Sequence, residues 1–356
     1  MVPRILLHIG LEKTGTTSIQ ITLRDNADLM AEHGIRFDQI FTPKGRNAVG
    51  NSLGLAAAAL NKDRRIQFLR GRGKAWDLPS SFDAYPLDDI AAAANLSLII
   101  FSSEQLSSWV TQPDEIQRLR DFLSRISDEI TVVAYLRRQD RLVQSLANET
   151  IKGGGVFNYK RVDSLIRVNS KKLSFVDTVR NYQEVFGAGN VILRPFAREA
   201  MADGDVVTDF ARLAGIDHLP FVRPAPTNAS LTLEALYVLS VLNDFEAVFG
   251  AQNGIRNART AVKRAGHGRL SIIPRKMAQE IVERFAEDNA ELGRMTGIEP
   301  FFDNSFDDFP VERPVIDAER VRTLLQLPAV TRVLGPYFRA GKGRKPESQH
   351  SVASQT

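Results

Sequence analysis

The chain has 356 residues, of which 43% are hydrophobic and 25% charged, and its net charge is +4. This composition is typical of a soluble globular protein, and the length suffices for one large α/β domain or two smaller ones. The small positive charge does not indicate nucleic-acid binding, although it suits an anionic ligand. The sequence has no cysteine, which excludes disulfides, thiolate catalysis and cysteine-ligated metals and fits a reducing compartment.

No apolar run reaches the ~20 residues that a membrane-spanning helix needs. The short apolar stretch at the start runs straight into a polar loop, without the length of a cleavable leader. We therefore expect a cytoplasmic protein, with peripheral contact to a membrane left open. No metal site is expected, because the five histidines are widely separated: His8, His33, His218, His267 and His350. We interpret His8 as a core histidine, since it lies inside an apolar run.

The first predicted element is a strand over residues 5–9, which stops at Gly10. The chain then reads Leu-Glu-Lys-Thr-Gly-Thr-Thr-Ser over residues 11–18, and a helical pattern of apolar residues follows, ending near Gly34. A glycine-containing loop between a strand and a helix N-terminus is typical of a phosphate site, because the free N–H groups and the helix dipole favour an anion. The usual nucleoside-triphosphate loop places its lysine directly after the second glycine, whereas here Lys13 precedes Gly15.

The chain continues as an alternation of strands and helices. Apolar periodicity and turn residues predict, in chain order, a strand over 35–37, a helix over 53–60, a strand over 96–101, a helix over 113–126, a strand over 131–136, a helix over 140–151, a helix over 175–186 and a strand over 190–193. This alternation predicts an α/β fold with a three-layer parallel sheet flanked by helices. Ligands of such sheets bind outside the carboxyl ends of the strands. Lys13, Glu104 and Arg137 each follow a predicted strand, so we expect them to converge.

The last third, from Asp205, is predicted to be mainly helical. Leu233, Leu236, Tyr237, Val241 and Phe245 form one helical stripe, and a second helix is expected over 274–292. Residues 341–356 are basic and then polar, with no apolar periodicity, and are expected to be a disordered tail. We expect residues 1–340 to form a single domain.

The strand over 131–136 ends in Arg137-Arg138-Gln139-Asp140, and a serine, Ser145, follows Arg137 by eight positions. This spacing resembles the 3′-phosphate motif of the sulfotransferases that use 3′-phosphoadenosine-5′-phosphosulfate (PAPS), and the Lys13 loop resembles their 5′-phosphosulfate loop. Together the two motifs resemble the bacterial members of this family. The segment Asn228-Ala229-Ser230-Leu231 resembles that group as well.

The resemblance implies a P-loop nucleotide-hydrolase-like fold and binding of PAPS as co-substrate without a metal. The residues it implies for nucleotide binding are Lys13, Thr14, Gly15, Thr16, Thr17, Ser18, Arg137 and Ser145. Lys13 would act as a catalytic cation, because charge builds on the bridging oxygen as the nucleotide departs. Three departures stand out: Ser18 replaces an aromatic residue, Gln139 replaces a proline, and the Arg-Lys-Gly segment of the cytosolic animal enzymes is absent.

Glu104 has two interpretations. A carboxylate at a strand's carboxyl end can accept the proton of an acceptor hydroxyl, and Ser-Ser-Glu here resembles the branches of the family that use a glutamate base. Glu104 could equally cap a helix or pair with a cation. Arg138 is interpreted as a surface residue. The charged residues 62–74 and the loop of His267 and Arg269 are read as solvated, with anion contacts as the alternative.

The sequence thus predicts a PAPS-dependent sulfotransferase acting on a hydroxyl, or less readily an amine, of a small-molecule or glycan acceptor. The acceptor is inferred by analogy alone. Alternatives are a P-loop kinase or nucleotide hydrolase and a non-catalytic nucleotide-binding module. The sequence does not specify the acceptor, the regiochemistry or the oligomeric state.

Overall fold

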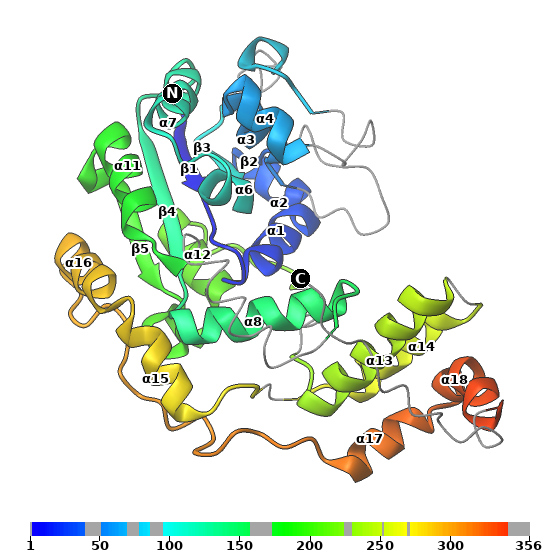
Figure 1. Ribbon diagram of the computed structural model, residues 1–356. Coiled ribbons are helices and arrows are strands. Elements are labelled where there is room, and N and C mark those ends of the chain that lie inside the picture. The colour runs from blue at the N-terminus through cyan, green and yellow to red at the C-terminus, as the bar shows by residue number, and fades with distance from the viewer. Residues whose placement is uncertain are drawn as a thin grey trace, which may run out of the picture. The chain divides into compact units, whose positions relative to one another are not determined.

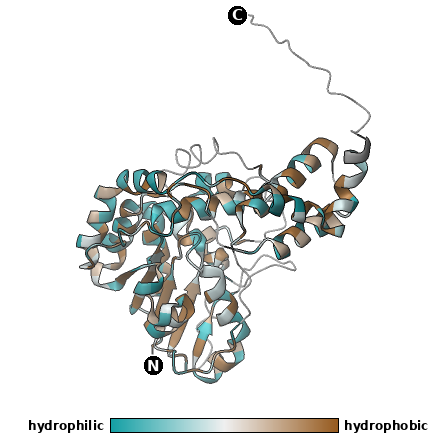
Figure 2. Cartoon of the chain, turned by 90° about the horizontal axis from the view of Figure 1, so that it is seen from below, coloured by the Kyte–Doolittle hydropathy of each residue, from teal (hydrophilic) through white to brown (hydrophobic). Residues whose placement is uncertain are grey.

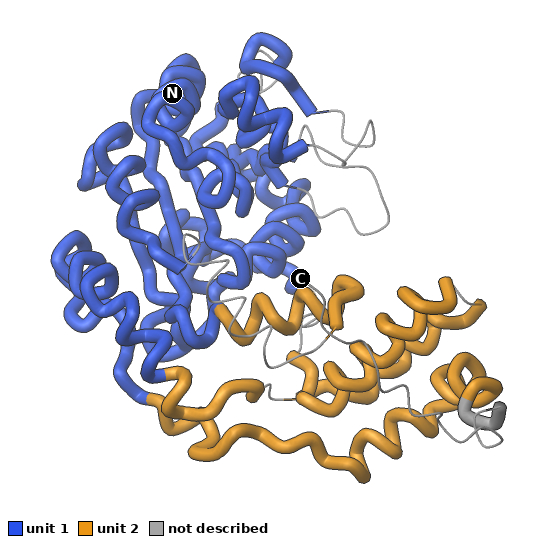
Figure 3. The backbone as a smooth tube through the Cα atoms, in the orientation of Figure 1, with its two compact units in different colours: residues 1–142, 166–227, 279–305 blue, residues 143–165, 228–278, 306–356 orange. Residues whose placement is uncertain are grey.

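A computed structural model of the chain describes residues 2–39, 51–69, 78–85, 95–156, 173–223, 230–250, 253–268 and 271–340. The predicted tail over 341–356, the basic residues Arg70, Arg72 and Lys74, the Asn228-Ala229 pair and Arg269 lie outside this part. The chain forms two compact units (Figure 3), one of residues 1–142, 166–227 and 279–305 and one of residues 143–165, 228–278 and 306–356. A single domain over 1–340 stays a prediction.

The first unit alternates strands and helices (Figure 1). Its elements are β1 (Arg4–His8), α1 (Thr16–Asp25), α2 (Ala27–Glu32), β2 (Ile35–Phe37), α3 (Leu53–Ala59), α4 (Lys62–Leu69), β3 (Leu98–Ser102), α6 (Glu104–Ser108), α7 (Pro113–Ser124), β4 (Ile130–Leu136), α11 (Val176–Phe186), β5 (Val191–Pro195), α12 (Val206–Ala214) and α16 (Ala286–Thr296). Short 3₁₀ helices span Phe82–Ala84, Ala188–Asn190, Arg198–Ala200 and Ala202–Gly204. Helices α8 (Gln139–Lys152) and α15 (Arg275–Glu283) begin in one unit and end in the other.

The five strands form one parallel sheet in the order β2-β3-β1-β4-β5. The strands are nearly continuous apolar runs, coloured brown in Figure 2, as expected when helices cover both faces of a parallel sheet. Side chains alternate between these faces. The predicted α/β fold with a parallel sheet between helices is therefore confirmed.

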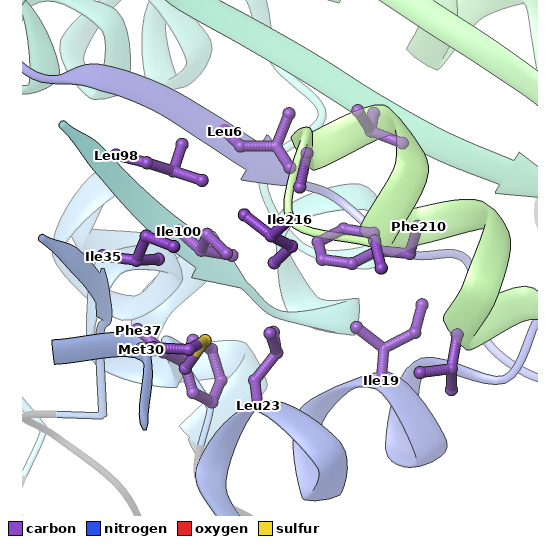
Figure 4. Packing of buried hydrophobic residues seen from close by; sticks show 14 of the residues in the cluster. Leu6, Ile19, Leu23, Met30, Ile35, Phe37, Leu98, Ile100, Phe210 and Ile216 are labelled. Atoms are coloured by element: carbon purple, nitrogen blue, oxygen red, sulfur yellow. The ribbon is translucent and has the colours of Figure 1, made fainter. Parts of the chain in front are cut away.

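One face of the sheet packs against α1, α2 and α12. Leu6 and Ile100 from the strands meet Ile19 and Leu23 of α1 and Phe210 of α12 in a buried cluster (Figure 4). The opposite face is covered by helices that pack on one another and on the strands, since α7 contacts α3 and α11, and α11 contacts β4 and β5. β1 occupies the centre of the sheet, so the loop that follows it lies between the loops of its two neighbours.

Two predicted helices are each divided in the structure. The helix expected after the Lys13 loop breaks at Asn26, whose side-chain Nδ2 donates to Thr22 O (2.7 Å) and to Val222 O (2.8 Å). Such side-chain bonds to the backbone compete with the helical pattern. The helix expected over 274–292 is interrupted before Phe285, whose φ of −117° and ψ of 20° are not helical.

The second unit is mainly helical, as predicted. It contains α13 (Leu233–Phe249), α14 (Ile255–Ala265), α17 (Ala318–Leu325) and α18 (Pro328–Ala340), and α14 packs against both α13 and α18. Leu233 and Leu236 of the predicted stripe are buried, but Tyr237 is 39% exposed. No helix in the described ranges has the length and apolar character needed to cross a bilayer.

Candidate functional site

The register of the sheet brings three loops to one edge of the first unit. His8, the last residue of β1, lies beside Ser102 at the end of β3 and beside Val133 of β4. Leu136 at the end of β4 lies beside Pro195 at the end of β5. The segments that follow these strands therefore begin at the same edge, as expected for parallel strands joined by helical crossovers.

The Lys13 loop has an unusual backbone. Lys13 has a φ of 70° and Gly15 a φ of 79°, both in the left-handed region, which costs a residue with a Cβ roughly 1–2 kcal/mol. A Cβ on Gly15 would also lie 2.7 Å from Val206 Cγ1. Glycine is therefore required at position 15, and Lys13 is held in a strained conformation of the kind that concentrates at functional sites.

The N-terminus of α1 has no capping side chain. Gly15 is its N-cap and supplies no side-chain cap, and the first turn contains no acidic residue. The N–H groups of Thr16 and Thr17 have no partner within the helix, because the first donors of any helix lack one. Unpaired donors and the positive end of the dipole attract an anion here.

The hydroxyl residues of the loop divide into two pairs. Thr14 is buried and its Oγ1 donates to Leu11 O over 2.6 Å. Thr16 Oγ1 is also buried, with no hydrogen-bond partner in the described part of the chain. Thr17 and Ser18 are half-buried. Thr17 and Ser18 are thus the more exposed hydroxyl residues of the loop, whereas Thr14 shapes it.

Arg137 reaches the Lys13 loop directly. Its Nη1 donates to the carbonyl oxygen of Lys13 over 2.8 Å, and its guanidinium lies 5.5 Å from the centre of the Phe196 ring. Its Nε is buried, and no described residue accepts a hydrogen bond from it. Burial and the nearby Arg141 lower the pKa of Arg137 to about 10, with Asp140 acting in the opposite direction.

Arg138 is not the surface residue that the sequence analysis expected. It is 2% exposed and binds Asp140 through two hydrogen bonds, Nε to Oδ1 (3.0 Å) and Nη2 to Oδ2 (2.8 Å). Its Nη1 donates to the backbone oxygen (2.7 Å) and to Oδ1 (2.8 Å) of Asp303. Arg138 therefore anchors residues 138–140 to a distant segment, and Arg137 remains the guanidinium directed at the loop.

Glu104 is the first residue of α6, directly after β3. Ser103 caps this helix by accepting a hydrogen bond from Gln105 N, and Glu104 is half-buried. Ser107 Oγ donates to Gly10 O over 2.9 Å and so ties α6 to the loop after β1. The structure therefore brings Glu104 to the same edge as Lys13 and Arg137, and its role as a base stays a prediction.

His8 is a buried core histidine, as the sequence analysis interpreted it. Its Nδ1 is 2.8 Å from Ser102 Oγ, which also accepts a hydrogen bond from Gln20 Nε2 (3.2 Å). Ser102 Oγ thus links His8 to Gln20, while His8 Nε2 is buried and has no hydrogen-bond partner among the described residues. Burial lowers the pKa of His8 to about 3, so the ring is neutral.

The remaining candidate residues are Ser145 and the arginines of the charged segment over 62–74. Ser145 lies on α8 in the second unit and is half-buried, and its pairing with Arg137 stays a prediction. Arg64 forms an ion pair with Glu115 and donates to Trp109 O. Arg65 donates to three backbone oxygens, those of Ala57, Leu78 and Pro79. These contacts of Arg64 and Arg65 stabilise the fold, so the two side chains are not the freely solvated charges that the sequence predicts. Among the described residues, no cluster of three or more histidine, aspartate or glutamate side chains could hold a metal ion.

Comparisons with known proteins give limited matches. No protein-family model matches the sequence. An uncharacterised protein of Archaeoglobus fulgidus is 30% identical over 127 residues, which span 35% of this chain and 33% of that protein. The crystal structure of a sulfotransferase from Alicyclobacillus acidocaldarius aligns with 83% of this chain and 96% of its own, at a TM-score of 0.46 and 14% identity. What the fold and the site themselves define is a parallel α/β protein with a glycine-containing loop after its central strand.

Proposed function

We propose that the chain is a sulfotransferase that moves a sulfuryl group from PAPS to a hydroxyl, or less readily an amine, of a small-molecule or glycan acceptor. One observation carries the proposal. The uncapped N-terminus of α1 and the guanidinium of Arg137 adjoin the same lysine, Lys13, because Arg137 Nη1 is 2.8 Å from Lys13 O. A nucleotide with phosphates at both its 5′ and 3′ positions offers one anion to each group.

The electrostatics of Arg137 favour an anionic ligand. A buried guanidinium is destabilised unless an anion or hydrogen-bond acceptors compensate it. Asp140 is engaged in two hydrogen bonds by Arg138, and Arg141 adds a like charge near Arg137. A phosphate would accept from the rigid donor fork of Arg137 in the bidentate geometry that guanidinium groups favour.

In the proposed reaction the acceptor oxygen attacks sulfur in line with the departing phosphate. A bond forms from the acceptor oxygen to sulfur, the bond from sulfur to the bridging oxygen breaks, and adenosine 3′,5′-bisphosphate leaves. The ammonium of Lys13 would stabilise the charge that grows on the bridging oxygen. Glu104 would accept the proton that the acceptor hydroxyl loses. The half-exposed hydroxyls of Thr17 and Ser18, with the N–H groups of the first turn, would bind the 5′-phosphate.

Ligand-dependent unfolding tests the proposal. A ligand that binds only the folded protein raises its melting temperature. We expect adenosine 3′,5′-bisphosphate to raise it strongly and ATP with Mg²⁺ to raise it little. Incubation with ³⁵S-labelled PAPS and a panel of sugar, phenol and amine acceptors would then identify the acceptor. A shift with ATP and Mg²⁺ alone would contradict the proposal and favour a kinase or nucleotide hydrolase.

A further inference from the structure

Phe196 lies where the two candidate phosphate-binding segments meet. It follows β5 directly, and its N–H donates to Leu136 O over 2.7 Å. Because Leu136 pairs with Pro195 in the sheet, the backbone register places Phe196 beside Arg137. The strands fix the backbone position of Phe196, so its side chain has a defined location relative to the guanidinium of Arg137.

The ring of Phe196 contacts both segments. The Arg137 guanidinium carbon lies 5.5 Å from the ring centre, within the distance at which a cation is attracted to an aromatic face. A Cβ on Gly15 would lie 3.3 Å from Phe196 Cε2, so the edge of the ring also closes against the Lys13 loop. Phe196 itself is half-buried and packs against the hydrophobic cluster of α1 and α12.

We propose that Phe196 is a positioning residue that holds the Arg137 guanidinium at a fixed offset from the Lys13 loop and thereby selects nucleotides with phosphates at both the 3′ and 5′ positions. This inference rests on the proposed function. Arg137 has a single hydrogen bond to protein through Nη1 in the described structure, and its Nε is buried without a partner. The ring therefore supplies the contact that restrains the plane of the donor fork.

Loss of the Phe196 ring should weaken binding of the 3′-phosphate and leave binding of the 5′-phosphate nearly unchanged. The N-terminus of α1 and the Lys13 loop do not depend on an aromatic side chain to bind a 5′-phosphate, whereas Arg137 without the ring keeps only its hydrogen bond to Lys13 O and loses the contact that restrains its plane. Phe196→Leu should therefore weaken binding of adenosine 3′,5′-bisphosphate by about tenfold and leave the affinity for AMP nearly unchanged. Phe196→Tyr, which keeps the ring, should restore most of the preference for the bisphosphate.

The experiment is isothermal titration calorimetry of wild type, Phe196→Leu and Phe196→Tyr with adenosine 3′,5′-bisphosphate and with AMP. Phe37→Leu is the matched control, because Phe37 belongs to the same hydrophobic cluster but lies on β2. The control should lower the melting temperature without changing the ratio of the two affinities. A merely structural role of Phe196 would give the same result as Phe37.

The outcomes separate the two proposals. A wild type that prefers the bisphosphate, with a preference lost in Phe196→Leu and regained in Phe196→Tyr, supports the inference. If wild type has the preference and Phe196→Leu keeps it, only the inference is overturned. If wild type binds neither nucleotide, or both equally, the proposed function fails and the inference fails with it.

Discussion

The guanidinium of Arg137 donates a hydrogen bond to the backbone oxygen of Lys13 although 124 positions separate the two residues. The contact joins the loop after the central strand β1 to the end of its neighbour β4. Parallel pairing of these strands brings the two segments to one edge of the sheet, where ligands of open α/β sheets bind.

Arg137→Met should abolish most bisphosphate binding without loss of stability. The folded state lowers the pKa of Arg137 to about 10, so at neutral pH, where the group is charged in both states, its burial destabilises the fold. The variant should melt at or above the temperature of wild type and bind adenosine 3′,5′-bisphosphate about 10- to 100-fold more weakly. Differential scanning fluorimetry and calorimetric titration would measure both. A strongly destabilised variant would contradict this account of an uncompensated cation.

Arg138→Met should behave in the opposite way. Removal of Arg138 leaves the carboxylate of Asp140 buried without its main partner, and breaking such a pair costs about 3–5 kcal/mol. Urea denaturation would measure the loss. The double variant Arg138→Met with Asp140→Asn should recover part of it, since the uncompensated charge is then gone. Equal stabilities of Arg138→Met and wild type would show that the ion pair is dispensable.

Lys13→Ala and Lys13→Gly should separate the catalytic role of the Lys13 ammonium from the energetic cost of the left-handed backbone at residue 13. Both variants lack the ammonium, so both should lose about 100-fold or more in turnover of PAPS, with a smaller effect on bisphosphate affinity. Because residue 13 has a φ of 70°, the glycine variant should be more stable than the alanine variant by about 1 kcal/mol. Steady-state kinetics and thermal unfolding would test the pair. Wild-type turnover in either variant would remove Lys13 from the reaction.

Glu104→Gln should lower turnover by about 100-fold if the carboxylate is the base. The change keeps size and hydrogen bonding, so the fold and the bisphosphate affinity should be preserved. The matched control is Glu129→Gln, next to the start of β4 at the opposite edge of the sheet from the proposed site. Turnover near that of wild type in Glu104→Gln would favour the alternative in which Glu104 has a structural role in the first turn of α6.

The buried His8 should lower the free energy of unfolding at acidic pH. Its folded pKa of about 3 lies below the ordinary histidine value of 6.5, so between these values the unfolded chain binds a proton that the folded chain does not. Stability should therefore fall as pH decreases from about 6.5 to 3, by up to about 1.4 kcal/mol per pH unit from this residue. Urea denaturation at pH 7.5 and 4.5 should show a smaller decrease for His8→Gln than for wild type. Equal decreases would mean that His8 takes up its proton in the folded state.

Sequence patterns of short range were enough to predict the fold class. Apolar runs that stop at glycine or at a polar loop located all five strands. The signal is clearest for β1, β3 and β4, because a strand buried on both faces has few polar positions. The same patterns missed the break at Asn26. Its side chain bonds to Val222, a partner 196 positions away that no local pattern contains.

The sequence by itself determined the Lys13 loop, since a left-handed backbone at residue 15 requires glycine and a helix that begins there requires first-turn donors without partners. Only the tertiary structure decided what surrounds the two adjacent arginines. Arg138 is buried against Asp140 and Asp303, whereas Arg137 faces Lys13 and Phe196. The physical reason is that neighbouring residues at a strand end diverge, and which of them meets the loop depends on strand register and on segments that the chain brings back from far away.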